Sequence, residues 1–207
     1  MTPWLWLVTS YLLGSVPASY LAGPLRGVDL RRAGSGTLGA TNTFRVLGAK
    51  VAAPVMLFDV LKGFVPTFFF AGWAGLAEPA RLGWSLAFGA AAIVGHVFSL
   101  YLRFKGGKGV ATAAGVFLAL APLAVGVALL VWLTVLRLGR MVSLASIVAA
   151  LTLLAVLLAL PHPAAVRGLG AAIAGFVVFA HRANLGRIRR GEEYRFGAAK
   201  PAAREDG

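Results

Sequence analysis

Long apolar blocks fill most of the chain up to residue 180, and they decide what it can fold into. A helix of about 20 apolar residues matches the roughly 30 Å hydrocarbon thickness of a bilayer. Inside lipid, every backbone polar group must find its partner within the protein, which favours helices. Only 13% of the 207 residues are charged, against about a quarter in soluble domains. The sequence therefore predicts an all-α polytopic integral membrane protein.

Polar interruptions set the boundaries of the expected spans. The expected spans cover residues 3–25, 51–76, 82–102, 142–160 and 164–180, with a further apolar block at 110–136. That block is ambiguous, since one helix there would be about 40 Å long, whereas a break near Pro122 would give two short helices. The first span starts close to residue 1 without a basic n-region, so we expect a retained helix and not a cleaved signal peptide.

The placement of lysine and arginine decides between these alternatives, because positive loops stay on the cytoplasmic side. If the block at 110–136 crosses twice, one side receives only Arg81 and Arg167. The other side then receives all the basic segments, which are 26–50, 103–108, 137–140 and the tail from 181. We therefore expect about seven transmembrane helices, with the N-terminus outside and the C-terminus cytoplasmic. Residues 1–196 form the expected single transmembrane domain, and 197–207 a disordered cytoplasmic tail.

The net charge of +13 indicates an anionic partner. The basic residues lie in short loops between apolar spans, so we expect a bilayer and an anionic substrate, and no nucleic acid. The chain has no cysteine, which excludes disulfides and thiolate metal sites. It has no carboxylate cluster suited to Mg²⁺ or Zn²⁺ and no nucleophile elbow. We expect neither a metal nor a cofactor.

A lysine–glycine run, residues 104–109, carries the clearest chemical signal. Glycine disfavours a helix, and lysine is costly at the edge of hydrocarbon. Glycines do let successive backbone N–H groups converge on a phosphate, while lysines supply charge. The run is not a Walker A motif, because Leu102 and Gly109 stand where that motif needs Gly and Ser or Thr. The alternative is an ordinary positive loop.

Two further polar segments are compatible with anion binding. Residues 34–42 satisfy G-x-G-x-x-G and precede Arg45, but no strand precedes them, so the dinucleotide interpretation fails. The alternative is a flexible loop with a Thr or Asn helix cap. In the tail, His181, Asn184 and Ile188 have the spacing of one helix face. The alternative there is a basic stretch that touches anionic lipid.

Smaller signals lie inside the apolar blocks. Asp59 and Lys62 are three residues apart and can pair on one helix face, which makes a structural ion pair the favoured interpretation. Intramembrane charges are nevertheless functional candidates. Ser143 and Ser146 follow Arg140, where serines most often serve helix packing or capping.

Taken in chain order, these segments resemble the acyl-phosphate-dependent glycerol-3-phosphate acyltransferase family of bacterial inner membranes (the PlsY family). The resemblance spans nearly the whole chain, and its matching pieces are 34–42 with Arg45, 59–63, 95–112, 140–146 and 181–193. One departure is Thr37, which stands where the family commonly has Asn. The resemblance implies a seven-helix enzyme whose active site faces the cytoplasm and needs no metal.

The resemblance implies a reaction. An acyl group passes from fatty acyl phosphate to the 1-hydroxyl of glycerol 3-phosphate, giving 1-acyl-glycerol 3-phosphate (lysophosphatidic acid) and phosphate, the first step of phospholipid synthesis. The implied catalytic residues are Ser35, Arg45, Lys105, Ser143, His181 and Asn184. The implied substrate-binding residues are Gly34, Gly36, Thr41, Asn42, His96, Gly106, Gly107, Lys108, Gly109 and Thr112. The expected structural residues are Asp59, Lys62 and Glu193.

Specific roles follow from this resemblance. We expect the Gly106 and Gly107 amides and Lys108 to hold the acyl phosphate, and Ser35, Arg45 and Lys105 to hold the glycerol phosphate. We further expect a monomer that is functionally coupled to the enzyme forming acyl phosphate. The rival is a transporter of a phosphorylated solute, although the chain shows no evident inverted repeat. A non-catalytic scaffold would leave the glycines unexplained.

Overall fold

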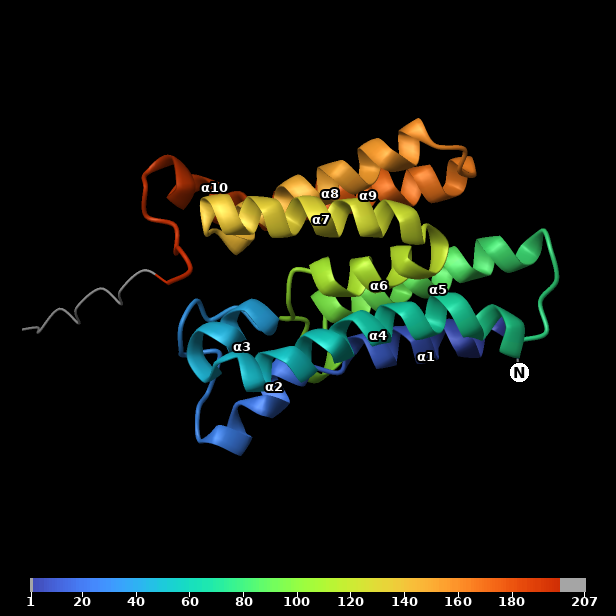
Figure 1. Cartoon of the computed structure of the whole chain (residues 1–207). Helices are drawn as coiled ribbons and strands as arrows, with labels where there is room; N and C mark the ends of the chain where they lie inside the picture. The colour runs from blue at the N-terminus through green and yellow to red at the C-terminus, as the bar shows by residue number, and fades with distance from the viewer. Residues whose placement is uncertain (1, 198–207) are drawn as a thin grey trace, which may run out of the picture.

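Helices and connecting turns make up the described part of the chain, residues 2–197, in this computed structural model (Figure 1). The elements are α1 (Pro3–Ser15), α2 (Ala18–Ala22), η1 (Pro24–Arg26), α3 (Ala40–Leu47), α4 (Ala49–Trp73), α5 (Ala80–Val97), η2 (Leu100–Leu102), α6 (Val110–Leu120), α7 (Pro122–Gly139), α8 (Val142–Ala159), α9 (Ala164–Ala180) and α10 (Arg182–Arg189). The disordered tail expected at 197–207 lies, from residue 198 on, outside the described residues.

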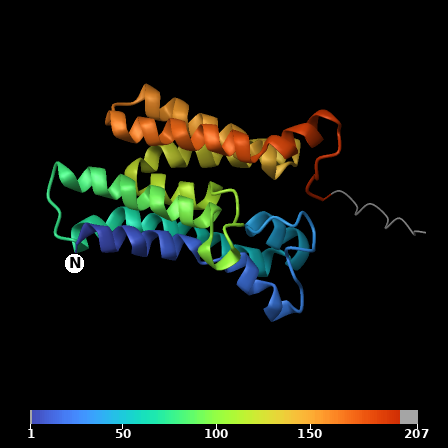
Figure 2. The ribbon, with the colours of Figure 1, turned by 180° about the vertical axis from the view of Figure 1, so that it is seen from behind.

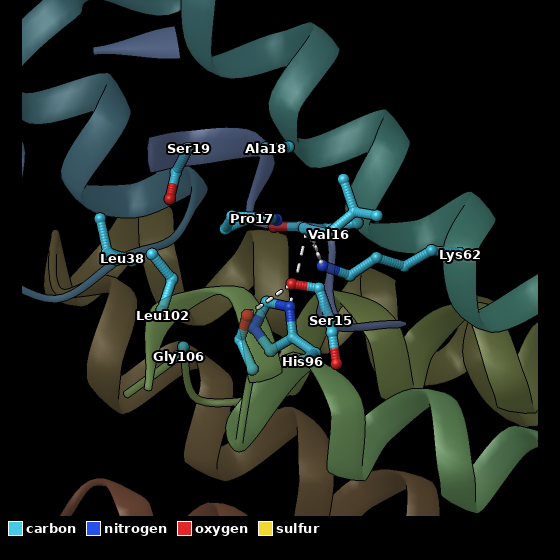
Figure 3. Close-up of a pocket in the computed structure, with 13 residues that line it drawn as sticks. Ser15, Val16, Pro17, Ala18, Ser19, Leu38, Lys62, His96, Leu102 and Gly106 are labelled. Carbon is cyan, nitrogen blue, oxygen red and sulfur yellow. Dashed lines mark hydrogen bonds and ion pairs between the residues drawn. The ribbon is translucent and has the colours of Figure 1, made fainter. Parts of the chain in front are cut away.

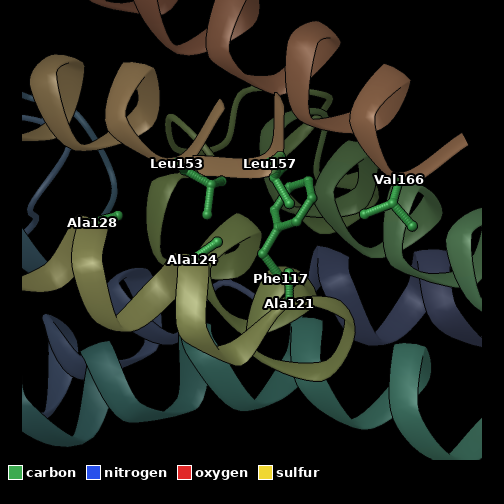
Figure 4. Close-up of a cluster of buried hydrophobic side chains, with 7 residues drawn as sticks. All are labelled: Phe117, Ala121, Ala124, Ala128, Leu153, Leu157 and Val166. Atoms are coloured by element: carbon green, nitrogen blue, oxygen red, sulfur yellow. The ribbon is translucent and has the colours of Figure 1, made fainter. Parts of the chain in front are cut away.

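The long helices form two groups that lie side by side in both views (Figures 1 and 2). In the first group, α4 packs against α6 and α5, and α1 packs against α5. In the second, α8 packs against α7 and α9. A buried apolar cluster joins the two groups (Figure 4), formed by Phe117, Ala121, Ala124, Ala128, Leu153, Leu157 and Val166. Small residues on α7 let the neighbouring helices approach closely.

The ambiguous block at 110–136 is two helices. The backbone of Ala121 leaves helical geometry (φ −151°), and Pro122 then starts α7. Proline suits this position, because the first amide of a helix needs no intrahelical partner and the ring already has a helical φ. The helix α6 has 11 residues and is therefore about 16 Å long.

Five helical segments of the described chain are long and apolar enough to cross a membrane, or six if the bent pair of α9 and α10 counts as one span. The shorter apolar helix α6 comes in addition. Residues that face outward are often large and apolar, such as Leu130 at 67% exposure, as expected for a surface that contacts lipid. The protein is therefore built as an integral membrane protein, while the count of seven crossings and the orientation of the termini stay predictions.

The structure adds detail to two expected segments. The first apolar block forms one candidate span, Pro3–Arg26, as expected; within it α1 ends at Ser15 and the chain bends at Val16 and Pro17 before α2. Proline disfavours helical geometry at the preceding residue and lacks an amide donor, which explains the break. The basic turn expected at 137–140 is shorter than predicted, since α7 continues through Gly139 and the chain turns at Arg140.

The basic segments gather at one end of the molecule. Figure 1 shows α2, α3, the turn between α7 and α8, and α10 at the end opposite to the N-terminus, with the loop before α6 facing the same way. These elements come from distant parts of the sequence, so the packing of the long helices brings them together. This end holds the candidate site.

Candidate active site

The lysine–glycine loop before α6 is tied to the end of α5. The amide of Gly106 donates to Val97 O at 2.9 Å, and the amide of Gly107 donates to His96 O at 3.1 Å. A Cβ on Gly107 would collide with His96 Nε2 and with Leu38 O, so only glycine fits between these groups. Both amides are thus occupied in the structure and are not free to receive a phosphate, contrary to the role expected for them.

Beneath this loop lies a buried charged cluster, which lines a narrow pocket together with the break after α1 (Figure 3). Lys62 Nζ lies 2.8 Å from Asp59 Oδ1 and donates to Val16 O at 3.0 Å. His96 Nδ1 lies 3.6 Å from the same Asp59 oxygen. Asp59 and Lys62 therefore form an intramembrane ion pair. His96, expected among the substrate-binding residues, is only 9% exposed and faces this pair.

The segment before α3 is shaped by Asn42. Its Nδ2 donates to Leu30 O at 3.1 Å and to Ala33 O at 3.0 Å, while its Oδ1 accepts the amide of Ser35 at 2.8 Å. Gly34 has a φ of +64°, and a Cβ there would collide with the Asn42 side chain. Asn42 is buried and braces the loop, and it leaves Ser35 exposed at its tip. The N-cap position of α3 is Gly39, without a side-chain cap, so the capping alternative for Thr or Asn is not seen.

Glu193 is the centre of a polar network that draws on three separate segments. Its Oε1 accepts from Ser143 Oγ and from Asn184 Nδ2, each at 2.7 Å, and its Oε2 accepts from Arg187 Nε at 2.8 Å. Lys108 Nζ in turn donates to Asn184 Oδ1. The start of α8, the helix α10 and the loop before α6 are thereby fixed to one another.

The charges in this network have shifted pKa values. Burial raises the pKa of the Glu193 carboxyl, but the hydrogen bonds from Ser143, Asn184 and Arg187 outweigh burial and bring it below its ordinary value. Burial lowers the pKa of the Lys108 amine to about 8. Glu193 opposes this shift, whereas the positive charges of Arg187 and Arg45 add to it. Arg45 therefore belongs to the same electrostatic neighbourhood.

Arg45 lies on α3 with its guanidinium 4.1 Å from the centre of the Tyr194 ring. Its Nε is buried and has no hydrogen-bond partner among residues 2–197. Lys105 is exposed on the loop before α6. A buried donor without a partner is uncommon in a folded protein and marks a place where a ligand can bind.

His181 and Thr112 are two further predicted site residues, and both are buried. His181 is buried at the bend between α9 and α10, where its Nδ1 lies 2.8 Å from Val177 O. A proton on Nδ1 would donate to this carbonyl and leave Nε2 as the accepting nitrogen. Thr112 is fully buried in α6, and its Oγ1 has no partner in the described chain. Its carbonyl lies against Gly63 of α4, so Thr112 sits at a helix contact below the loop.

The structure thus joins Lys108, Ser143 and Asn184 in one bonded network, with Arg45 and His181 close enough to affect or feel the charge of Lys108. His96 and Thr112 lie apart from it, beneath the loop. Sequence reasoning missed Arg187 and Tyr194. Arg187 is one of several arginines in the basic tail, six residues before its partner Glu193, whereas Tyr194 contacts Arg45, which only the fold brings near. Within residues 2–197, no three His, Asp or Glu side chains come together as a metal site.

Comparisons with known proteins identify the family of the chain. The family model described as Glycerol-3-phosphate acyltransferase matches residues 4–191. A glycerol-3-phosphate acyltransferase of Synechococcus elongatus is 47% identical over 193 residues, which is 91% of each chain. Another, from Trichlorobacter lovleyi, is 45% identical over 194 residues, covering 93% of this chain and 97% of that protein.

The fold also matches a solved structure. A crystal structure of PlsY, an integral membrane glycerol 3-phosphate acyltransferase in its glycerol 3-phosphate form, superposes with a TM-score of 0.87 at 37% identity. The match covers 94% of this chain and 96% of that chain. Sequence and fold therefore agree, and the chain belongs to the glycerol-3-phosphate acyltransferase (PlsY) family.

Proposed function

We propose that this protein transfers an acyl group from fatty acyl phosphate to the 1-hydroxyl of glycerol 3-phosphate. The products are 1-acyl-glycerol 3-phosphate and inorganic phosphate. Family membership supports the acceptor, since relatives along nearly the whole chain are named for it. The donor and the product rest on the chemistry of the site, together with the resemblance in the lysine–glycine loop.

The observation that carries the proposal is the charge balance of the polar end. The positive charges of Arg45 and Arg187 both act on Lys108 there, and Lys105 stands on the same loop as Lys108. The one carboxylate seen in the bonded network, Glu193, is engaged by three donors. Two phosphate-bearing substrates repel each other, so a site that joins them must be strongly cationic. This excess of positive charge suits such a pair.

The residues divide between the two substrates. Lys108 holds the acyl phosphate, while Arg45 and Lys105 hold the glycerol phosphate beside Ser35. Arginine suits a phosphate because its planar group can donate two parallel hydrogen bonds. The neutral donors Ser143, His181 and Asn184 orient the acceptor hydroxyl or polarise the acyl carbonyl. Glu193 holds the network in place.

The proton of the acceptor hydroxyl passes to the departing phosphate. The hydroxyl oxygen forms a bond to the acyl carbon, the bond from that carbon to the phosphate oxygen breaks, and the phosphate leaves with the proton. Glu193 is a poor base, because three donors stabilise its charged form and lower its pKa. An acyl phosphate is an activated donor, so positioning and electrostatics can supply most of the catalysis.

We infer that this chemistry takes place on the cytoplasmic face of the bacterial plasma membrane, and the position of the basic segments supports this. They share one end of the molecule (Figure 1), and positive loops remain in the cytoplasm during insertion. This orientation also gives the site access to a water-soluble acceptor from the cytoplasm and to a lipid-soluble donor from the bilayer.

The test is a reaction of the purified protein in lipid with palmitoyl phosphate, with and without glycerol 3-phosphate. We expect phosphate release that depends on the acceptor and matches the formation of lysophosphatidic acid. Arg45→Ala and Lys105→Ala should each raise KM for glycerol 3-phosphate by about tenfold or more, since a charged hydrogen bond contributes roughly 1.5–3 kcal/mol.

No product from folded, correctly inserted protein would overturn the proposal. Uptake of glycerol 3-phosphate into proteoliposomes would then support a transporter. Near-normal KM in both variants, with product still formed, would instead refute the assignment of Arg45 and Lys105.

A further inference from the structure

The segment after α10 crosses the polar end of the molecule. We call residues 193–197 the C-terminal strap. It follows residue 191, where the match to the family model ends. At its start, Glu193 accepts hydrogen bonds from Ser143 and Asn184. Figure 1 shows the chain then running from α10 toward α3.

Three contacts anchor the far part of the strap. The Tyr194 ring lies against the guanidinium of Arg45, 4.1 Å from ring centre to Cζ. The Phe196 ring packs on Phe44 with centroids 4.6 Å apart. Phe196 also exchanges two hydrogen bonds with Arg140, since its amide donates to Arg140 O at 2.6 Å and its carbonyl accepts from Arg140 Nε at 2.7 Å.

These contacts join the two halves of the site. Arg45 and Phe44 belong to α3, which packs on α4 in the first group of helices. Ser143 and Asn184 belong to α8 and α10, in the second group. The strap holds both within four residues, from Glu193 to Phe196. It therefore sets the position of the glycerol phosphate side of the site relative to the network around Lys108.

Arg45 depends on such support. The helix α3 has eight residues, and an arginine side chain has large rotamer freedom to lose on binding. Its Nε lies buried without a hydrogen-bond partner in the described chain, so the Tyr194 ring restrains the guanidinium without using up its donors. A guanidinium that is held over a ring face by cation–π attraction keeps its N–H groups available to bind an anion.

We propose that Tyr194 is a positioning residue, which holds Arg45 ready to bind the phosphate of glycerol 3-phosphate. The proposal rests on the proposed function. It assigns the acceptor side of the reaction to the strap. It predicts that changing Tyr194 weakens the binding of glycerol 3-phosphate and leaves the binding of acyl phosphate unchanged. Plain packing of a chain end would give no such selectivity.

The experiment compares three variants in lipid with palmitoyl phosphate and glycerol 3-phosphate. Tyr194→Leu removes the aromatic face, and Tyr194→Phe keeps it. Tyr20→Leu is the matched control, because Tyr20 lies 4.9 Å under Arg31 in the same kind of contact outside the proposed site. We expect Tyr194→Leu to raise KM for glycerol 3-phosphate about fivefold. KM for palmitoyl phosphate and the unfolding temperature should be the same in Tyr194→Leu as in the Tyr20→Leu control.

Tyr194→Phe should restore KM for glycerol 3-phosphate to within about twofold of the unsubstituted protein, since the ring alone carries the contact. Combining Tyr194→Leu with Arg45→Ala tests the route, because alanine leaves no cation for the ring to hold. If Tyr194 acts through Arg45, the two changes are not additive, because coupling appears only between interacting residues. In the Arg45→Ala background, Tyr194→Leu should therefore change KM less than twofold.

The outcomes separate the two proposals. Absence of product from the unsubstituted protein would defeat the proposed function. An active protein in which Tyr194→Leu leaves KM for glycerol 3-phosphate unchanged would defeat the role of Tyr194 alone. Equal rises in both KM values, or full additivity with Arg45→Ala, would show that the strap only stabilises the fold.

Discussion

At the scale of single residues, the proposed role of Lys108 predicts a reaction that is sensitive to alkaline pH. Its pKa of about 8 means that the amine is protonated below pH 8 and loses its charge as the pH rises through that value. Glu193 stays ionised throughout, because its pKa lies below the ordinary value. We expect kcat/KM for acyl phosphate to fall about tenfold for each pH unit above 8.

The control for this prediction is Lys108→Arg, which keeps its charge over the whole range. Its kcat/KM should be lower than that of the unsubstituted protein at pH 7 but should stay level up to pH 9. Rates are corrected for spontaneous hydrolysis of the donor. An equally steep alkaline fall in the arginine variant would assign the titration to another group.

We expect the buried pair of Asp59 and Lys62 to contribute to the stability of the protein. Their side chains are 4% and 2% exposed, so Asp59→Asn leaves a buried ammonium with the carbonyl of Val16 and no counter-charge. We expect a loss of about 3 kcal/mol, measured as a lower unfolding temperature in detergent. Adding Lys62→Met should recover much of it, because removing both charges avoids the unpaired one. An unchanged unfolding temperature in Asp59→Asn alone would refute this role.

Residue spacing showed only part of this chemistry. The pairing of Asp59 with Lys62 was readable, since residues three apart share a helix face. Glu193 was expected to support basic side chains, but its hydrogen bond to Ser143 spans 50 residues of sequence and has no local signature. Tyr194 was not singled out, because one aromatic residue in a basic tail gives no periodic signal. Contacts of this kind form only once the chain has folded, so the spacing of residues along the sequence does not predict them.

At the scale of elements, the close contact of α4 and α6 depends on glycine. A Cβ on Gly115 would collide with Val60 O, and one on Gly63 would collide with Thr112 O. Small residues let membrane helices approach closely. Gly115→Ala should therefore destabilise the protein by about 1–3 kcal/mol through overpacking, despite the better helix propensity of alanine.

Gly126 in α7 is the matched control, because nothing lies within 4 Å of a Cβ built there. Gly126→Ala should raise stability by about 0.5–1 kcal/mol, as alanine favours a helix. Thermal unfolding of both variants in the same detergent compares the signs. A stabilising shift in both variants would mean that α4 and α6 are further apart than described.

Sequence patterns located most helices but not all of their ends. Charge placement favoured a break near Pro122, and the structure has it at Ala121. The first span was located correctly, but the bend at Pro17 inside it was not singled out, because the apolar run continues through the proline. There the chain exposes Val16 O, which accepts from Lys62. Hydropathy indicates which segments lie in lipid, but it carries no information on a hydrogen bond such as the one from Lys62.

At the scale of the whole molecule, the chain separates an apolar exterior from a cationic end. This division was predictable, since both hydropathy and the order of basic segments are written along the sequence. The pairing of the two helix groups was not, because the cluster around Phe117 (Figure 4) joins residues from four segments of the chain. Packing of that cluster is what aligns α3 with α10 across the site.

The shortness of α6 has a consequence for how the donor arrives. With 11 residues it is about 16 Å long, roughly half the hydrocarbon thickness. Figure 1 shows its first turn lying inward of α3 and α10. We expect this placement to let the loop before α6 meet the headgroup of a donor whose acyl chain stays in lipid. On the proposed function, supply is then a two-dimensional process. The mole fraction of acyl phosphate in the bilayer, and not its amount per litre of buffer, becomes the quantity that saturates the enzyme.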